Sequence, residues 1–178
     1  MIKDFSVHPK PQNNNSKKVM WVFYALGAVA AVLSVMLESY RGVVGLAALA
    51  LISSGILMFT KYVSVAFYYD IVAEGVDTPM FIVRQRIGKR DVTLCRLDLA
   101  DIVSVKRETA AERKAHVREQ GTAYYVYAPT LNPPVSYRML VTGARERAEL
   151  VLEGTDEFFK MITDLAAEAR TLRQDDEE

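Results

Sequence analysis

Two uncharged, apolar segments decide the fold of this chain: VMWVFYALGAVAAVLSVML (residues 19–37) and GVVGLAALALISSGILMFT (residues 42–60). Each would form a helix about 28 Å long at a rise of roughly 1.5 Å per residue, close to the roughly 30 Å hydrocarbon core of a bilayer. Only Glu38, Ser39, Tyr40 and Arg41 separate the two segments. The pattern therefore predicts a transmembrane hairpin over residues 19–60, with helices at about 19–38 and 42–62.

The absence of charge inside both segments bears on function. Pumps and transporters keep ionisable groups in the membrane although each costs roughly 2.5–3.5 kcal/mol to insert, so we do not expect a pore or pump from this hairpin alone. Small residues recur four positions apart, as in Gly27 and Ala31 or Ala50 and Ser54. This spacing lets helices approach closely. We expect the hairpin to pack on itself; packing against a partner or a second copy is the alternative.

Basic residues orient the hairpin. Lysines gather on the side that both termini share, whereas the connection carries one acid and one arginine (Lys3, Lys10, Lys17, Lys18 and Lys61 against Glu38 and Arg41). The positive-inside rule then places both termini in the cytoplasm of a multi-pass protein of the plasma membrane.

The segments outside the hairpin differ in composition. Residues 1–18 contain two prolines, an asparagine run and few large apolar side chains, which predicts a disordered cytoplasmic tail. Residues 174–178 predict an acidic tail. The length of the segment between them, residues 63–173, suits one compact cytoplasmic domain.

Alternating apolar and polar residues predict seven strands in this domain, at about residues 66–74, 81–87, 92–95, 102–107, 122–128, 137–142 and 148–152. Gly88 and Lys89 suit a two-residue type II′ turn. The charged segment 108–120 is either an exposed helical insert or a mobile loop. Thr155 and the acids after it predict the start of a final helix, whose apolar stripe should cover an apolar surface (Phe158, Phe159, Ile162, Leu165, Ala166, Ala169 and Leu172).

Seven strands in hairpin succession followed by one amphipathic helix resemble the pleckstrin-homology fold. A helix pair ahead of such a domain resembles the small bacterial membrane proteins that carry a PH-like domain, and the resemblance covers residues 19–172. It implies seven antiparallel strands in a partly open barrel capped by the C-terminal helix. Lipid-binding members of the family carry a basic cluster around the first hairpin. Here the corresponding turn, 74–79, has Glu74 and Asp77 and no basic residue, which argues against headgroup capture there.

Basic side chains gather instead on the next hairpin (Arg84, Arg86, Lys89, Arg90 and Arg96). A solvated outer strand face is the usual reason for such a cluster. The sharper alternative is contact with anionic lipid headgroups, worth about 1 kcal/mol for each basic residue near the surface.

The residue pattern favours no enzyme, cofactor or metal site. The sequence has no glycine-rich phosphate loop, nucleophile elbow or zinc-binding histidine pair. Cys95 is the single cysteine, so we interpret it as a core or surface thiol. Asp98 and Asp101 suit a capping role. Tyr124, Tyr125 and Tyr127 suit a half-buried strand, with ligand stacking as the alternative.

These patterns leave three functional hypotheses. The first is a non-enzymatic membrane protein whose cytoplasmic domain associates with itself or with another membrane protein. The second is a sensor of anionic lipid headgroups or of the membrane surface, acting through the basic hairpin. The third is an accessory subunit of a transporter or envelope complex. With 22 basic and 22 acidic residues, no nucleic-acid partner is expected, and no small-molecule substrate is identified.

Overall fold

The computed structural model describes residues 5–73, 79–117, 119–143 and 147–176. The chain divides into two compact units: residues 13–65, and residues 1–12 together with 66–178. Most of the turn expected at 74–79 lies outside the described residues.

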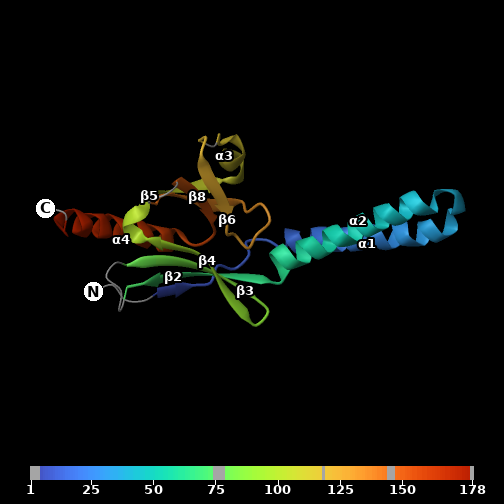
Figure 1. The fold of residues 1–178 in the computed structure, drawn as a ribbon, viewed down its shortest axis with the longest axis horizontal. Helices are drawn as coiled ribbons and strands as arrows, with labels where there is room; N and C mark the ends of the chain where they lie inside the picture. The colour runs from blue at the N-terminus through green and yellow to red at the C-terminus, as the bar shows by residue number, and fades with distance from the viewer. Residues whose placement is uncertain (1–4, 74–78, 118, 144–146, 177–178) are drawn as a thin grey trace. The chain divides into compact units, whose positions relative to one another are not determined.

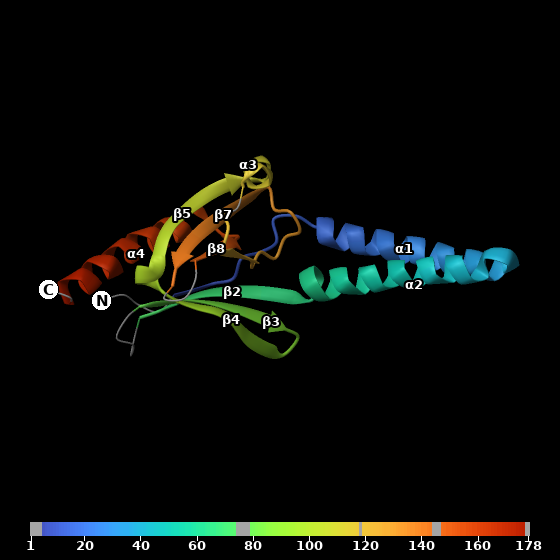
Figure 2. The same cartoon turned by 45° about the horizontal axis from the view of Figure 1, so that its top comes forward.

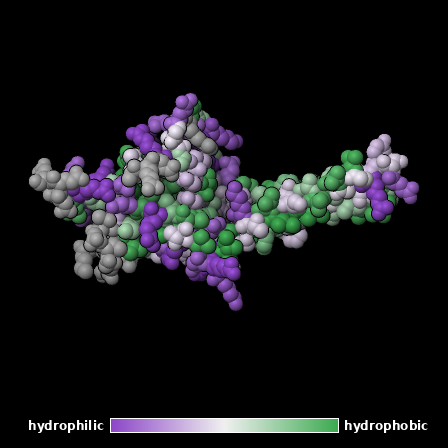
Figure 3. Space-filling view, viewed as in Figure 1, coloured by the Kyte–Doolittle hydropathy of each residue, from purple (hydrophilic) through white to green (hydrophobic). Residues whose placement is uncertain are grey.

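The first unit is the helical hairpin. It consists of α1 (Asn15–Met36), the short 3₁₀ helix η1 (Glu38–Tyr40), α2 (Arg41–Met58) and a π-helical turn, η2 (Phe59–Val63). Two helices, Asn15–Met36 and Glu38–Val63, are long and apolar enough to cross a membrane. Apolar side chains cover the hairpin surface, and polar residues gather at its η1 end (Figure 3). The two helices thus form where the sequence predicted them.

Glycines set the close approach of α1 and α2. A Cβ atom on Gly27 would lie 2.7 Å from Cγ1 of Ile52, and one on Gly55 would lie 2.8 Å from the ring of Tyr24. Gly45 has no such neighbour within 4 Å. The hairpin therefore packs on itself through Gly27 and Gly55, as the spacing of small residues predicted.

The second unit, here called the β domain, contains two four-stranded sheets (Figure 1). Sheet A has the order β1 (Phe5–Val7), β2 (Val65–Val72), β3 (Met80–Ile87) and β4 (Arg90–Asp98). The 3₁₀ turn η3 (Leu99–Asp101) leads into sheet B, whose order is β5 (Ile102–Thr109), β7 (Val135–Thr142), β8 (Arg147–Leu152) and β6 (Thr122–Val126). The helices α3 (Ala110–Ala115) and α4 (Asp156–Asp176) complete the domain.

The core lies where the two sheets and α4 meet (Figure 2). The ring of Tyr69 stacks on Phe158 at 6.1 Å, and Tyr137 stacks on Phe159 at 3.9 Å. These contacts explain the apolar stripe of α4, whose first three turns are buried, while Leu172 near its end is exposed. Thr155 caps the helix by accepting a hydrogen bond from the Phe158 N–H, as expected.

The expected seven-stranded, partly open barrel is not confirmed. In the described residues eight strands form two sheets that do not close. The expectation that all strands are antiparallel is wrong, because β6 runs parallel to β8. The segment 108–120 supplies α3, which begins with a capping box between Thr109 and Glu112. The chain then reaches the far side of β8, so that β6 enters the sheet in the parallel direction.

The expectation of a disordered tail over residues 1–18 is also wrong for its described part. Residues 5–7 form β1, and α1 already begins at Asn15. The N–H of Gln12 donates to Thr130 Oγ1 over 2.8 Å, and its side-chain amide donates to the Val135 carbonyl over 2.8 Å. At the other end of the chain, residues 174–176 continue α4 instead of starting a separate tail.

A buried polar network fixes this N-terminal segment. The hydroxyl of Thr130 donates to Glu153 Oε1 over 2.6 Å, and the Thr130 N–H donates to Oε2 over 2.9 Å. The Tyr69 hydroxyl donates to the Tyr127 carbonyl and accepts the N–H of Glu153. Burial raises the pKa of both Tyr69 and Glu153.

Candidate functional site

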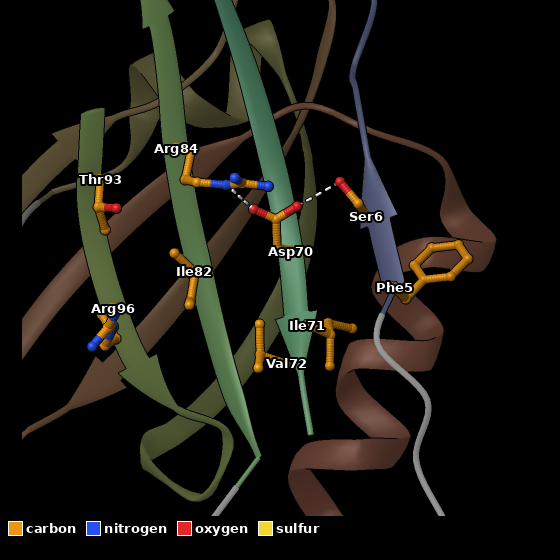
Figure 4. A pocket seen from close by; sticks show the side chains of 9 residues that line it. All are labelled: Phe5, Ser6, Asp70, Ile71, Val72, Ile82, Arg84, Thr93 and Arg96. Atoms are coloured by element: carbon orange, nitrogen blue, oxygen red, sulfur yellow. Dashed lines mark hydrogen bonds and ion pairs between the residues drawn. The ribbon is translucent and has the colours of Figure 1, made fainter. Parts of the chain in front are cut away.

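The five basic residues predicted as a lipid contact separate into three groups. Arg84 lies on the outer face of sheet A, where its guanidinium pairs with the buried carboxylate of Asp70 (Figure 4). The hydroxyl of Ser6 donates to the other oxygen of Asp70. These contacts link β1, β2 and β3, and the hydrogen bond to Asp70 raises the pKa of Arg84. Arg84 therefore has a structural role.

Arg86 is also paired. Its Nε donates to Asp91 Oδ1 over 2.7 Å and its Nη2 donates to Oδ2 over 3.0 Å. The guanidinium lies 5.0 Å from the ring centroid of Tyr68, which stacks in turn on His8 at 4.8 Å. The hydrogen bonds between Arg86 and Asp91 raise the pKa of the arginine and lower that of the acid.

Lys89 lies in the turn between β3 and β4, and Arg90 is the first residue of β4. Within the described residues, neither has an ion-pair partner. Gly88 has φ 61° and Lys89 has a negative φ, the pattern of the expected type II′ turn. The neighbouring Ile87 and Val92 are 48% and 45% exposed. We call residues 87–92 the basic tip, and Figure 3 shows its strongly hydrophilic surface.

The position of the basic tip follows from the strand register. Arg84 lies beside Asp70, and Arg86 beside Tyr68, so the tip lies level with the start of β2. β1 pairs antiparallel with β2, with Val7 opposite Tyr69, and the His8 ring bonds to the Phe67 carbonyl. Both chain connections to the apolar helices therefore leave sheet A from the end that carries the tip.

Arg96 lies apart from the tip, near the other end of β4. It lines two hollows: one of about 440 Å³ on the outer face of sheet A, floored by Ile82 and Val72, and one of about 540 Å³ between the sheets. No carboxylate of the described chain lies within ion-pair distance of it. Figure 4 shows Arg96 on the edge strand below Thr93.

The larger hollow, here called the β4–β6 cleft, lies where the edge strands of the two sheets part. β4 contributes Leu94, Cys95 and Leu97; the end of β6 and the residue after it contribute Tyr125 and Tyr127. Its floor reaches core residues of sheet B (Val141, Ala148 and Leu150). The two tyrosine rings lie parallel, with centroids 5.9 Å apart. Cys95, Tyr125 and Tyr127 thus line the same hollow, although nothing in the sequence linked the cysteine to the tyrosines.

The Cys95 thiol and the Tyr127 hydroxyl of the cleft stay uncharged at neutral pH. Burial raises the pKa of the Cys95 thiol. Burial, together with charge repulsion from Cys95 and Tyr125, raises the pKa of Tyr127 to about 12. Arg96 therefore supplies the only full charge among the described residues that line the cleft.

No protein-family model and no curated protein matches this sequence. The resemblance to PH-like membrane proteins therefore stays a prediction that rests on element order.

The structure also shows the contacts of Asp98 and Asp101, for which the sequence predicted a capping role. Asp98 caps η3 by accepting the Ala100 N–H, and Arg173 of α4 pairs with both Asp98 and Asp101. Asp98 thus has the expected capping role, whereas the contact shown for Asp101 is its ion pair with Arg173. Among the described residues, no three histidine, cysteine or acidic side chains are placed to hold a metal ion.

A buried charge cluster on the other face of sheet B was not predicted. Arg138 donates to Glu108 over 2.7 Å and lies 3.8 Å from Glu149, which His116 contacts at 3.1 Å. Arg138 alternates with Tyr137 and Met139, and Glu149 alternates with Ala148 and Leu150, as on an ordinary strand with a solvated face. Alternation alone therefore gave no signal for a buried charge cluster. The cluster ties the segment after α3 to the sheet.

Proposed function

We propose that this is a non-enzymatic, multi-pass membrane protein with both termini in the cytoplasm, and that its β domain contacts anionic headgroups through the basic tip. The apolar hairpin anchors the chain. The tip then sets which surface of the β domain faces the bilayer and which surface faces the cytoplasm.

The position of the tip carries this proposal. The β3–β4 turn lies at the end of sheet A from which the chain leaves toward both apolar helices. A short connection there keeps the tip near the membrane surface if the helices span the bilayer. Lys89 and Arg90 supply two positive charges that no carboxylate of the described chain neutralises, and the exposed Ile87 and Val92 suit the interfacial region.

Three of the five predicted contacts are not part of the proposal. Arg84 and Arg86 are held by Asp70 and Asp91, so each pair presents little net charge to a lipid surface. Arg96 lies toward the opposite end of β4. We rank headgroup contact above association with a partner protein because the place and the chemistry of the tip both match an anionic bilayer.

A tryptophan at the tip tests the proposal in the full chain. Trp21 is the single tryptophan, so Trp21→Phe with Ile87→Trp gives one reporter. The protein is placed in nanodiscs of phosphatidylcholine, alone or mixed with phosphatidylglycerol, with bromine on the lipid chains near the headgroup. Quenching of Trp fluorescence should be stronger in the anionic nanodiscs and should weaken at high salt.

Charge variants supply the decisive comparison. Lys89→Gln with Arg90→Gln removes about 2 kcal/mol of attraction, so the tip–surface equilibrium should fall about thirtyfold. Lys106→Gln with Lys160→Gln is the matched control, because both lysines are exposed and lie outside the tip. A reporter from Val103→Trp, at the start of β5, should stay unquenched. Equal quenching at position 87 in both lipids, unchanged by the tip variant, would reject headgroup contact.

A further inference from the structure

The β4–β6 cleft has the size and depth of a ligand site. Its volume of about 540 Å³ falls within the roughly 300–1,000 Å³ of small-molecule pockets. The floor is formed by core side chains, Val141 and Leu150, which are 2% and 1% exposed. The cleft is therefore an opening into the core between two sheets that do not close.

The cleft has mostly apolar walls and one charged residue, Arg96. Leucine, valine and alanine side chains and two parallel tyrosine rings form the walls. The thiol of Cys95 and the hydroxyl of Tyr127 are neutral at physiological pH because burial raises both pKa values. Arg96 is the one charged residue among the described residues that line the cleft. Its side chain is exposed on the edge strand and also lines the hollow on the outer face of sheet A.

The cleft lies between two edge strands, β4 and β6, but a peptide strand that pairs with β4 does not suit it. β4 is bulged opposite Val83 and Arg84, and charged residues stand along it (Arg90, Asp91 and Arg96). Bulges and charges are devices that keep edge strands from pairing with other chains. The occupant should instead match an apolar slot with a cation at its edge.

We propose that the β4–β6 cleft binds a single-chain anionic amphiphile, with its hydrocarbon chain between Leu97, Tyr127 and Leu150 and its acidic head on Arg96. The hydrocarbon chain covers the apolar walls, and the head meets a cation that has no carboxylate partner in the described chain. This proposal does not depend on the basic tip, because Arg96 lies outside it.

Cys95 supplies an intrinsic reporter of occupancy. It is the only cysteine of the chain and lines the cleft, so a bound ligand should shield it from alkylation. The full chain is placed in phosphatidylcholine nanodiscs, since detergents are themselves amphiphiles. The alkylation rate by iodoacetamide is then measured against increasing decanoate, decanol or acetate. Decanoate should slow the reaction at lower concentration than decanol, and acetate should have no effect.

Arg96→Gln tests the charged contact. The protection of each variant is expressed relative to its own alkylation rate without ligand. The decanoate concentration for half protection should rise about fivefold, whereas the value for decanol should not change. Lys106→Gln is the matched control, because this exposed lysine lies outside both the basic tip and the cleft, and it should behave as the wild type.

Three outcomes overturn the proposal. If decanoate does not slow the alkylation of Cys95, the cleft does not bind such an amphiphile. Equal protection by decanoate and decanol assigns a purely apolar occupant and removes the role of Arg96. An equal loss of decanoate protection in Lys106→Gln shows a general effect of charge instead of a contact in the cleft.

Discussion

Replacing Thr130 by valine tests the network that fixes the N-terminal segment. Valine keeps the shape of threonine and removes its hydroxyl, which donates to Glu153 Oε1 over 2.6 Å and accepts the Gln12 N–H over 2.8 Å. Thr130 and Glu153 are 2% and 1% exposed, so water does not readily replace the lost donor. A hydrogen bond to a charged group contributes about 1.5–3 kcal/mol. We therefore expect Thr130→Val to destabilise the β domain by about 2 kcal/mol at neutral pH.

Urea unfolding of the full chain in mild detergent measures this loss, with near-UV circular dichroism of the tyrosines as the signal. At a slope of roughly 2 kcal/mol per molar urea, the midpoint should fall by about 1 M. Thr130→Ser is the matched control. It keeps the hydroxyl and removes one methyl group, which costs about 0.8 kcal/mol. Hydrogen exchange of residues 5–12 should also accelerate in the valine variant.

The relative stability of Thr130→Val and Thr130→Ser shows whether the hydroxyl or the packing of Thr130 matters more. If packing alone mattered, valine would be the better replacement and serine the worse one. A valine variant as stable as the wild type, or more stable than the serine variant, would refute the claim that the Thr130 hydroxyl holds the buried carboxylate.

Two other predictions concern the helical hairpin and Glu153. Gly55→Leu should force the Tyr24 ring away from α2 and cost about 1–3 kcal/mol of hairpin stability, whereas Gly45→Leu should cost far less, as measured by thermal unfolding in detergent; equal melting temperatures would contradict the observed helix packing. Burial raises the pKa of Glu153, so the protonated carboxyl contributes to the stability of the folded state. This contribution is fully present below the ordinary carboxyl pKa and is lost as the pH rises through the folded-state pKa. Glu153→Gln should therefore gain stability relative to the wild type as the pH rises from about 4 to about 8, and a difference independent of pH would show that burial of this carboxyl has no such effect.

Much of the fold could be predicted because its signals are local. Two helices were expected from uninterrupted apolar runs, and seven of the eight strands from alternation. α4 was expected from its capping threonine and apolar stripe. Each of these signals lies within about twenty residues of sequence.

What could not be predicted depends on partners far apart in the chain. β1 has three residues, too few for a periodicity, and it is ordered by Ser6 on Asp70 and Gln12 on Thr130 and Val135. The parallel pairing of β6 with β8 leaves no trace in alternation, because parallel and antiparallel strands share the same period.

In the candidate site, too, local features could be predicted, whereas contacts between residues far apart in the chain could not. The sequence identified the basic hairpin, but the ion pairs of Arg84 and Arg86 depend on Asp70 and Asp91 and leave only Lys89 and Arg90 unpaired at the tip. The β4–β6 cleft was missed because its residues come from four strands. Aromatic residues two apart on the predicted fifth strand, Tyr125 and Tyr127, were the one local signal for it.

The place of the hairpin in the chain connects these observations. The apolar helices are inserted between two neighbouring, hydrogen-bonded strands, β1 and β2, and do not simply precede the β domain. A fragment that starts at Lys61 would lose β1, the bond from Ser6 to Asp70 and the contacts of Gln12, and would expose the edge of β2. Because the chain enters and leaves the sheet at one end, the apolar hairpin holds the β domain through two connections. Two connections allow less rotation than a single linker does. Under the proposed function, contacts of Lys89 and Arg90 with headgroups would therefore act on a domain whose freedom is already reduced.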